Sequence, residues 1–109
     1  MFATTPQDHM DVAFRRERAI SLTKTLVQDL IELGVSVRII GSLANGSFGP
    51  ESDIDILVME CPYRLKYRIE AMVEDALDGF LFDVVYCDEI PPHRLARFTR
   101  ESVDASDLH

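Results

Sequence analysis

Hydrophobic residues recur along the chain with two different spacings, which together predict an alternation of helices and strands. Over residues 8–33 they return every three or four positions, which is typical of a helix with one buried face. Gly34 follows directly, as glycine commonly does after the last turn of a helix. Apolar and polar residues then alternate over residues 35–40, so a short strand is predicted to run into Gly41.

The rest of the chain predicts a loop and four further elements. Residues 41–50 contain three glycines and a proline among small polar residues, which suits a loop with one helical turn. The elements predicted after it are a strand at 54–58, a helix at 65–77, an apolar strand at 80–87 and a helix at 93–101. Because residues 102–109 are polar and acidic, we expect this last stretch to fray.

This order of elements predicts an α/β (α+β) fold, in which a small mixed β-sheet is covered by helices mainly on one face. The 109 residues are enough to close one hydrophobic core without disulfides or a structural metal. We therefore expect a single domain over residues 1–109. Its parts are an N-terminal helix at 8–33, a central core at 35–87 and a C-terminal helix at 91–101.

Charge and composition narrow the classes of partner. The formal net charge is −8 at pH 7, so the chain lacks the basic field with which most nucleic-acid binders attract phosphates. No stretch approaches the roughly 20 apolar residues of a membrane span, and residues 1–10 lack the basic start and apolar run of a signal peptide. Cys61 and Cys87 lie far apart without a metal-ligand pattern, which indicates reduced thiols. We expect a cytoplasmic protein that binds neither membranes nor, stably, nucleic acid.

Three aspartates form a candidate site. Asp53 and Asp55 are two residues apart at a predicted strand, so both side chains point to the same face and repel each other unless a cation or proton lies between them. Asp83 interrupts an apolar run that reads as a strand buried on both faces, where an unpaired carboxylate is costly. Plainer alternatives stay open: an acidic strand end in solvent for the pair, and an arginine salt bridge or an edge position for Asp83.

The order of the motifs sharpens this hypothesis. A Gly-Ser turn at 41–42 opens a short helix, an Asp-x-Asp strand follows about ten residues later, and a third carboxylate comes on a later strand. This arrangement closely resembles the signature of the polymerase β-like nucleotidyltransferase superfamily, and in length the chain is similar to the minimal nucleotidyltransferases of prokaryotes. A P-loop is excluded because Ser47 and Phe48 stand where its lysine and hydroxyl residue belong.

The resemblance implies that the 35–87 core is the catalytic part of a nucleotidyltransferase. Asp53 and Asp55 would hold two Mg²⁺ ions that bridge the phosphates of ATP, and Asp83 would hold the ion beside the acceptor hydroxyl. The nucleotide-binding residues that it implies are Gly41, Ser42, Asn45, Gly46 and Ser47. Gly41 and Ser42 suit this role chemically, because glycine permits close backbone approach and a serine at a helix start offers a hydroxyl and an N–H. Where many relatives carry arginine, Asn45 supplies no charge.

The same resemblance implies a partner and a substrate. Similar minimal nucleotidyltransferases act as antitoxins: they transfer AMP from MgATP to a hydroxyl, a tyrosine in that family, of a cognate HEPN-domain ribonuclease toxin, and form a hetero-oligomer with it. Two alternatives stay open, namely an antitoxin that neutralises the toxin by binding alone, which Asn45 favours, and transfer to a small molecule. No chemistry is assigned to His9, His93 or His109, which have no partners in sequence.

Overall fold

The computed structural model describes the backbone of residues 5–109 and the side chains of residues 12–109. The strands are β1 (Ser36–Ile40), β2 (Ile54–Glu60) and β3 (Phe82–Tyr86), and the α-helices are α1 (Thr5–Glu32), α2 (Gly41–Asn45), α3 (Lys66–Ala76) and α4 (Pro92–Glu101). Three single-turn 3-10 helices complete the chain: η1 (Tyr63–Leu65), η2 (Cys87–Glu89) and η3 (Ala105–Asp107). The expectations placed on residues 1–10 and on His9 concern side chains outside the described residues.

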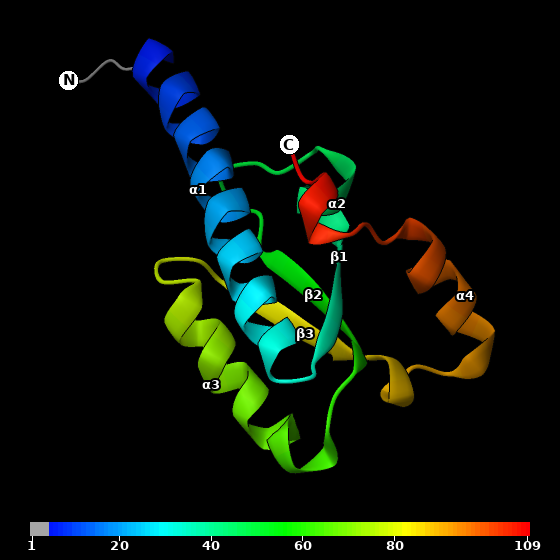
Figure 1. Ribbon diagram of the computed structural model, residues 1–109. Coiled ribbons are helices and arrows are strands. Elements are labelled where there is room, and N and C mark those ends of the chain that lie inside the picture. The colour runs from blue at the N-terminus through cyan, green and yellow to red at the C-terminus, as the bar shows by residue number, and fades with distance from the viewer. Residues whose placement is uncertain (1–4) are drawn as a thin grey trace.

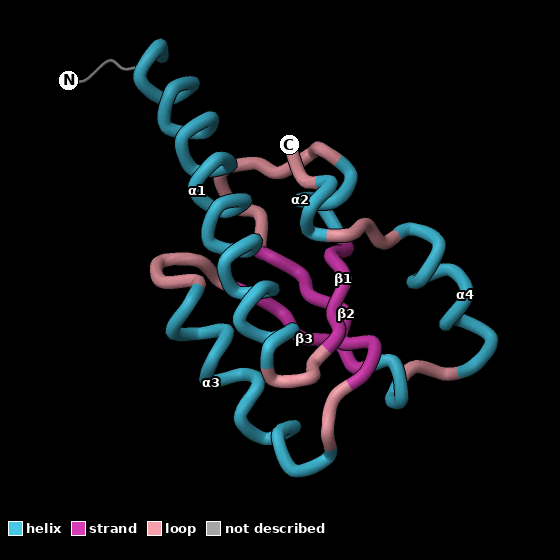
Figure 2. Tube along the Cα trace, in the orientation of Figure 1, coloured by secondary structure: helices cyan, strands magenta, loops and turns pink. Residues whose placement is uncertain are grey.

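The three strands form one mixed sheet, as the sequence predicts, and their order in it is β1-β2-β3. β1 runs antiparallel to β2, whereas β3 is parallel to β2 and is reached through α3. Figure 1 shows α1 and α3 lying together over one face of this sheet, with α4 apart from them beyond β1. The tube in Figure 2 shows how short the strands are beside α1.

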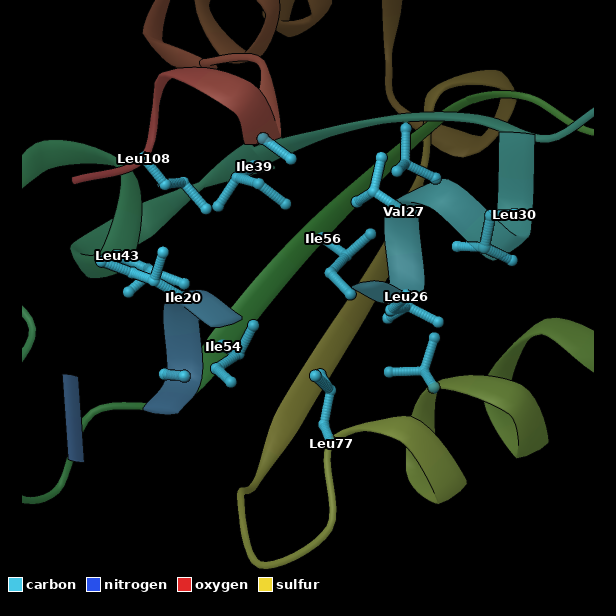
Figure 3. Packing of buried hydrophobic residues seen from close by; sticks show 14 of the residues in the cluster. Ile20, Leu26, Val27, Leu30, Ile39, Leu43, Ile54, Ile56, Leu77 and Leu108 are labelled. Carbon is cyan, nitrogen blue, oxygen red and sulfur yellow. The ribbon is translucent and has the colours of Figure 1, made fainter. Parts of the chain in front are cut away.

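The core lies between the sheet and the two covering helices. Alternate residues of β2, Ile54 and Ile56, are fully buried and point toward the apolar stripe of α1, which includes Leu26 and Leu30 (Figure 3). The period of two in the strand and of three to four in the helix brings the two stripes together. Outside this cluster, Leu57 is also fully buried.

The structure corrects the prediction that the run 80–87 is a strand buried on both faces. β3 begins only at Phe82, its residues are half-buried at most, and Asp83 is exposed. The reason is its place at the edge of the sheet, because an edge strand with helices on one face keeps an open side. Asp83 therefore occupies an edge position, which is one of the plainer alternatives that the sequence allows.

The structure also contradicts the expectation that residues 102–109 fray. Ser102, Ala105 and Leu108 are buried, and Val103 exchanges two backbone hydrogen bonds with Ile39 of β1, at 2.8 and 2.9 Å. The stretch is polar in composition, but its few apolar residues fall at the positions that face α1 and β1. Figure 1 shows the C-terminal end beside α2 and α1.

Among the described helices, none is long and apolar enough to cross a membrane. Cys61 and Cys87 are free thiols, each half-buried.

Candidate active site

The sheet brings two of the three predicted carboxylates together. Asp55 of β2 is the register partner of Asp83 in β3, and neighbouring strands lie about 4.8 Å apart. Asp53 immediately precedes β2 and lies two residues before Asp55, so in extended backbone its side chain leaves the chain on the same side as that of Asp55. Asp55 is half-buried, whereas Asp53 and Asp83 are exposed. The strand register therefore explains how residues about thirty positions apart in sequence meet.

These carboxylates interact electrostatically. Burial raises the pKa of Asp55 above its ordinary value, and the neighbouring charges of Asp83 and then Asp53 raise that pKa further. Within residues 12–109, none of the three forms an ion pair with a lysine, arginine or histidine. A cation bound here would relieve the repulsion, since an opposite charge nearby favours the ionised carboxylate.

Gly41 lies directly against Asp55. Its φ is +73°, and a Cβ on Gly41 would lie 3.1 Å from Cγ of Asp55 and overlap its Oδ2. Both the backbone conformation and the lack of space therefore require glycine here. Gly41 thus brings the Gly-Ser turn of the sequence motif against Asp55, and Ser42, which follows it, is half-buried.

Asn45, Gly46 and Ser47 lie at the other end of α2. The side-chain oxygen of Asn45 accepts hydrogen bonds from the backbone N–H of Ser47, at 2.9 Å, and from its hydroxyl, at 2.5 Å. Gly46 ends the helix with φ +87°. Asn45 and Gly46 line a separate cavity of about 180 Å³ with the C-terminal residues. In this structure these three residues shape the turn after α2, in which the N–H groups of Gly46 and Ser47 donate to the carbonyl oxygen of Ser42, at 3.1 and 3.0 Å.

A larger cavity adjoins the carboxylates through Gly41. It has a volume of about 490 Å³ and is lined by Ile40, Gly41, His93, Arg94, Arg97, Phe98 and Glu101. Arg97 forms an ion pair with Glu101, with 3.2 Å between Nε and Oε2. Arg94 has no such acidic partner on α4 and lies over the ring of Phe98, so its positive charge is not balanced within that helix. Sequence reasoning missed this cavity. The spacing of Arg94 and Arg97, three residues apart on one predicted helix, is the signal that could have found it.

The donor set suits a hard divalent cation such as Mg²⁺, which prefers carboxylate oxygens. Across residues 12–109, no three His, Cys, Asp or Glu side chains already converge closely enough to hold a metal ion. The backbone places Asp55 and Asp83 side by side, and the side chains of Asp53 and Asp83 are exposed and free to rotate. The residues therefore fit the ion in type and placement, and binding requires that the exposed carboxylates turn inward.

Known proteins resemble the chain in sequence and in fold. The sequence model of a family described as "Nucleotidyltransferase domain" matches residues 20–105. A solved structure described as that of a candidate minimal nucleotidyltransferase superposes with a TM-score of 0.62, covers 84% of this chain and 91% of its own, and is 24% identical in sequence. This likeness confirms the predicted fold class. No curated protein matches the chain significantly.

Proposed function

Because the chain belongs to the nucleotidyltransferase domain family, we propose that it transfers AMP from ATP to a hydroxyl of another protein. The observation that carries the proposal is the pairing of Asp55 with Asp83 beside Gly41, with Asp53 at the entry to the same strand. The members of this carboxylate group come from adjoining strands, so the sheet holds their backbones in fixed register.

The reaction sets simple requirements for these residues. The acceptor oxygen forms a bond to the α-phosphorus, the bond from that phosphorus to the bridging oxygen breaks, and pyrophosphate leaves. Divalent cations held by Asp53, Asp55 and Asp83 would supply the positive charge that offsets the phosphates. Asp83 is exposed at the open edge of the sheet. An acceptor side chain on a protein surface therefore has direct access to it, and Asp83 can hold the hydroxyl proton as it leaves.

We assign the nucleotide to the cavity between Gly41 and α4. Its volume of about 490 Å³ falls within the range of small-molecule sites. Arg94 brings the positive charge that Asn45 lacks, Arg97 lies beside it paired with Glu101, and Phe98 offers a flat apolar surface to a base. Neither this cavity nor a second one of equal volume, lined by Tyr63, Lys66, Tyr67, Glu70, Tyr86 and Glu89, is lined by one of the three aspartates, but only the first includes Gly41, which lies against Asp55. The lysine of the second cavity is already paired with Asp88 and Glu89.

As acceptor we propose a tyrosine of a cognate HEPN-domain toxin, following the resemblance of the sequence. A net charge of −8 together with arginines on α4 favours docking on a protein surface over binding RNA. Neutralisation by binding alone is the second candidate. It is favoured by Asn45, which carries no charge and whose side-chain oxygen is already bound by Ser47.

Intact-mass spectrometry tests this function. The chain is incubated with MgATP and the helical partner encoded beside it, and the Asp53→Ala, Asp55→Ala double variant serves as the inactive form. Asp75→Ala, Asp78→Ala is a matched control, since it removes two exposed carboxylates from α3 and the turn after it, which are not among the candidate site residues. We expect the partner mass to rise by whole adenylyl units with the wild type and the control only. A partner that binds tightly but stays unmodified would establish neutralisation by binding.

A further inference from the structure

We propose that Arg15 of α1 is a positioning residue for the candidate active site, because it fixes the loop that carries Asp53. Its Nη1 donates a hydrogen bond to the carbonyl oxygen of Gly49, at 2.9 Å. Its Nη2 donates to the carbonyl oxygen of Ser52, at 3.3 Å. One guanidinium thus joins the long N-terminal helix to the residue immediately before Asp53.

Two aromatic rings hold this guanidinium in place. Its central carbon lies 5.0 Å from the centroid of Phe48 and 4.9 Å from that of Phe80. Phe48 is buried, with 5% of its surface exposed. The guanidinium therefore combines close contact with two aromatic rings and two hydrogen bonds to backbone carbonyls, a combination that arginine is suited to provide.

The two residues that Arg15 contacts, Gly49 and Ser52, are also hydrogen-bonded to each other and so close the loop before Asp53. The N–H of Ser52 donates to the carbonyl oxygen of Gly49, at 3.1 Å, and the hydroxyl of Ser52 accepts from the N–H of Gly49, at 2.9 Å. The N–H of Ile54 then donates to the carbonyl oxygen of Leu81, at 3.0 Å. Asp53 therefore lies between two residues whose backbones are held in place: Ser52 is hydrogen-bonded to Arg15 of α1, and Ile54 is hydrogen-bonded to Leu81. The backbone of Asp53 is fixed although its side chain is exposed.

The three carboxylates differ in what supports them. Asp55 and Asp83 are held by the sheet register, which does not involve Arg15. Loss of Arg15 should therefore displace Asp53 alone and weaken cation binding without removing it. This inference rests on the proposed function only in assigning Asp53 to the cation site.

The test compares Arg15→Gln, Arg15→Lys and Arg18→Gln. Arg18 is the matched control, because it lies one turn further along α1 and over the same Phe80 ring, at 6.0 Å, but its side chain is exposed. Two readouts need neither partner nor turnover: the affinity for Mn²⁺, measured by electron paramagnetic resonance, and the hydrogen-exchange protection of the Gly49 and Ser52 amides.

We expect Arg15→Gln to weaken Mn²⁺ binding about tenfold and to speed amide exchange at Gly49 and Ser52. Arg15→Lys should fall between Arg15→Gln and the wild type in both measurements. Arg18→Gln should match the wild type in both. Equal Mn²⁺ affinities in wild type and Arg15→Gln, or equal losses in Arg15→Gln and Arg18→Gln, would overturn the proposal. If Arg15→Gln fails to fold, Arg15→Lys decides by the same two measurements. A wild type that binds no Mn²⁺ would instead contradict the proposed function, and with it any role of Arg15 toward a cation.

Discussion

At the scale of single residues, Asp55 combines burial with two neighbouring negative charges. Its pKa in the folded protein is raised, so the folded state binds this proton more tightly than the unfolded state. Without metal, the stability that this residue contributes is greatest below the ordinary carboxyl pKa of 3.8. It is lost as the pH rises through the raised pKa of the folded state.

Asp55→Asn should therefore stabilise the metal-free protein at neutral pH. We expect a gain of about 1 kcal/mol in unfolding free energy, or a rise of ~4–8 °C in Tm, that disappears by about pH 3.5. Urea unfolding of both proteins across this pH range measures it. Mg²⁺ should raise the Tm of the wild type and not of the variant, and an exposed control, Asp75→Asn, should show neither effect. A destabilised Asp55→Asn at pH 7 would argue against repulsion among the carboxylates.

Gly41 and Gly46 form a matched pair for testing the close approach to Asp55. Both have positive φ, so alanine at either should cost about 1–3 kcal/mol of stability. Only at Gly41 would the added Cβ overlap Asp55, because nothing lies within 4 Å of a Cβ at Gly46. We expect Gly41→Ala to lose nucleotidyl transfer and Mn²⁺ affinity, and Gly46→Ala to lose stability alone. Equal losses of Mn²⁺ affinity in the two variants would contradict the role given to Gly41.

Single-residue chemistry was predictable where it depends on local spacing. A period of two places Asp53 and Asp55 together, and the glycine before Ser42 marks a close approach. The exposure of Asp83 was not predictable, because it depends on which strand lies at the edge of the sheet. Arg15 was not predictable either, since its hydrogen bonds span 34 and 37 residues.

At the scale of elements, the C-terminal stretch closes the core. Leu108 is 4% exposed and belongs to the main hydrophobic cluster. Leu108→Ala should destabilise the protein by about 2–4 kcal/mol, the usual cost of truncating a buried leucine. Leu81→Ala is the control, because Leu81 is 74% exposed and should change stability by less than ~0.5 kcal/mol. Denaturant unfolding measures both, and similar stabilities would show that residues 102–109 do not pack as described.

The arginines of α4 allow a second test between matched positions. Arg94 and Arg97 line the cavity next to Gly41, whereas Arg100 does not. The double variant Arg94→Gln, Arg97→Gln should weaken MgATP binding by roughly tenfold or more, since charge-assisted bonds to phosphate are worth ~1.5–3 kcal/mol each. Arg100→Gln, measured by the same calorimetric titration, should bind as the wild type does. If loss of Arg100 weakened MgATP binding as much as loss of Arg94 and Arg97 does, the arginines would act only by long-range electrostatic attraction of the nucleotide.

The positions of the helices could be predicted from the sequence more reliably than the contacts that the elements make with one another. α1 and α3 were predicted because apolar spacing and a following glycine are local signals, and both helices end within two residues of the expected positions. The packing of the C-terminal stretch was missed because its partners are remote. Arg38, for example, donates hydrogen bonds to both the hydroxyl and the carbonyl oxygen of Ser102, 64 residues away.

At the scale of the whole molecule, the net charge of −8 governs encounters with other polyanions. Non-specific binders of nucleic acid reach dissociation constants of about 10⁻⁴ to 10⁻⁶ M through cationic surfaces. We expect no change in the fluorescence anisotropy of a labelled single-stranded RNA at protein concentrations up to ~100 μM and physiological salt. Binding that weakens steeply with added salt would contradict this and would place RNA among the ligands of the arginines on α4.

The edge position of β3 has a consequence for handling the protein. Of the described residues, none pairs with the outer side of this strand, whereas Val103 covers part of β1 at the opposite edge. A charged side chain on an open edge strand discourages two copies from joining their sheets, and Asp83 provides that charge. Asp83→Ala would therefore remove a carboxylate from the site and a barrier to aggregation at once. Light scattering belongs beside every activity measurement on that variant, because self-association would lower turnover without any change in chemistry.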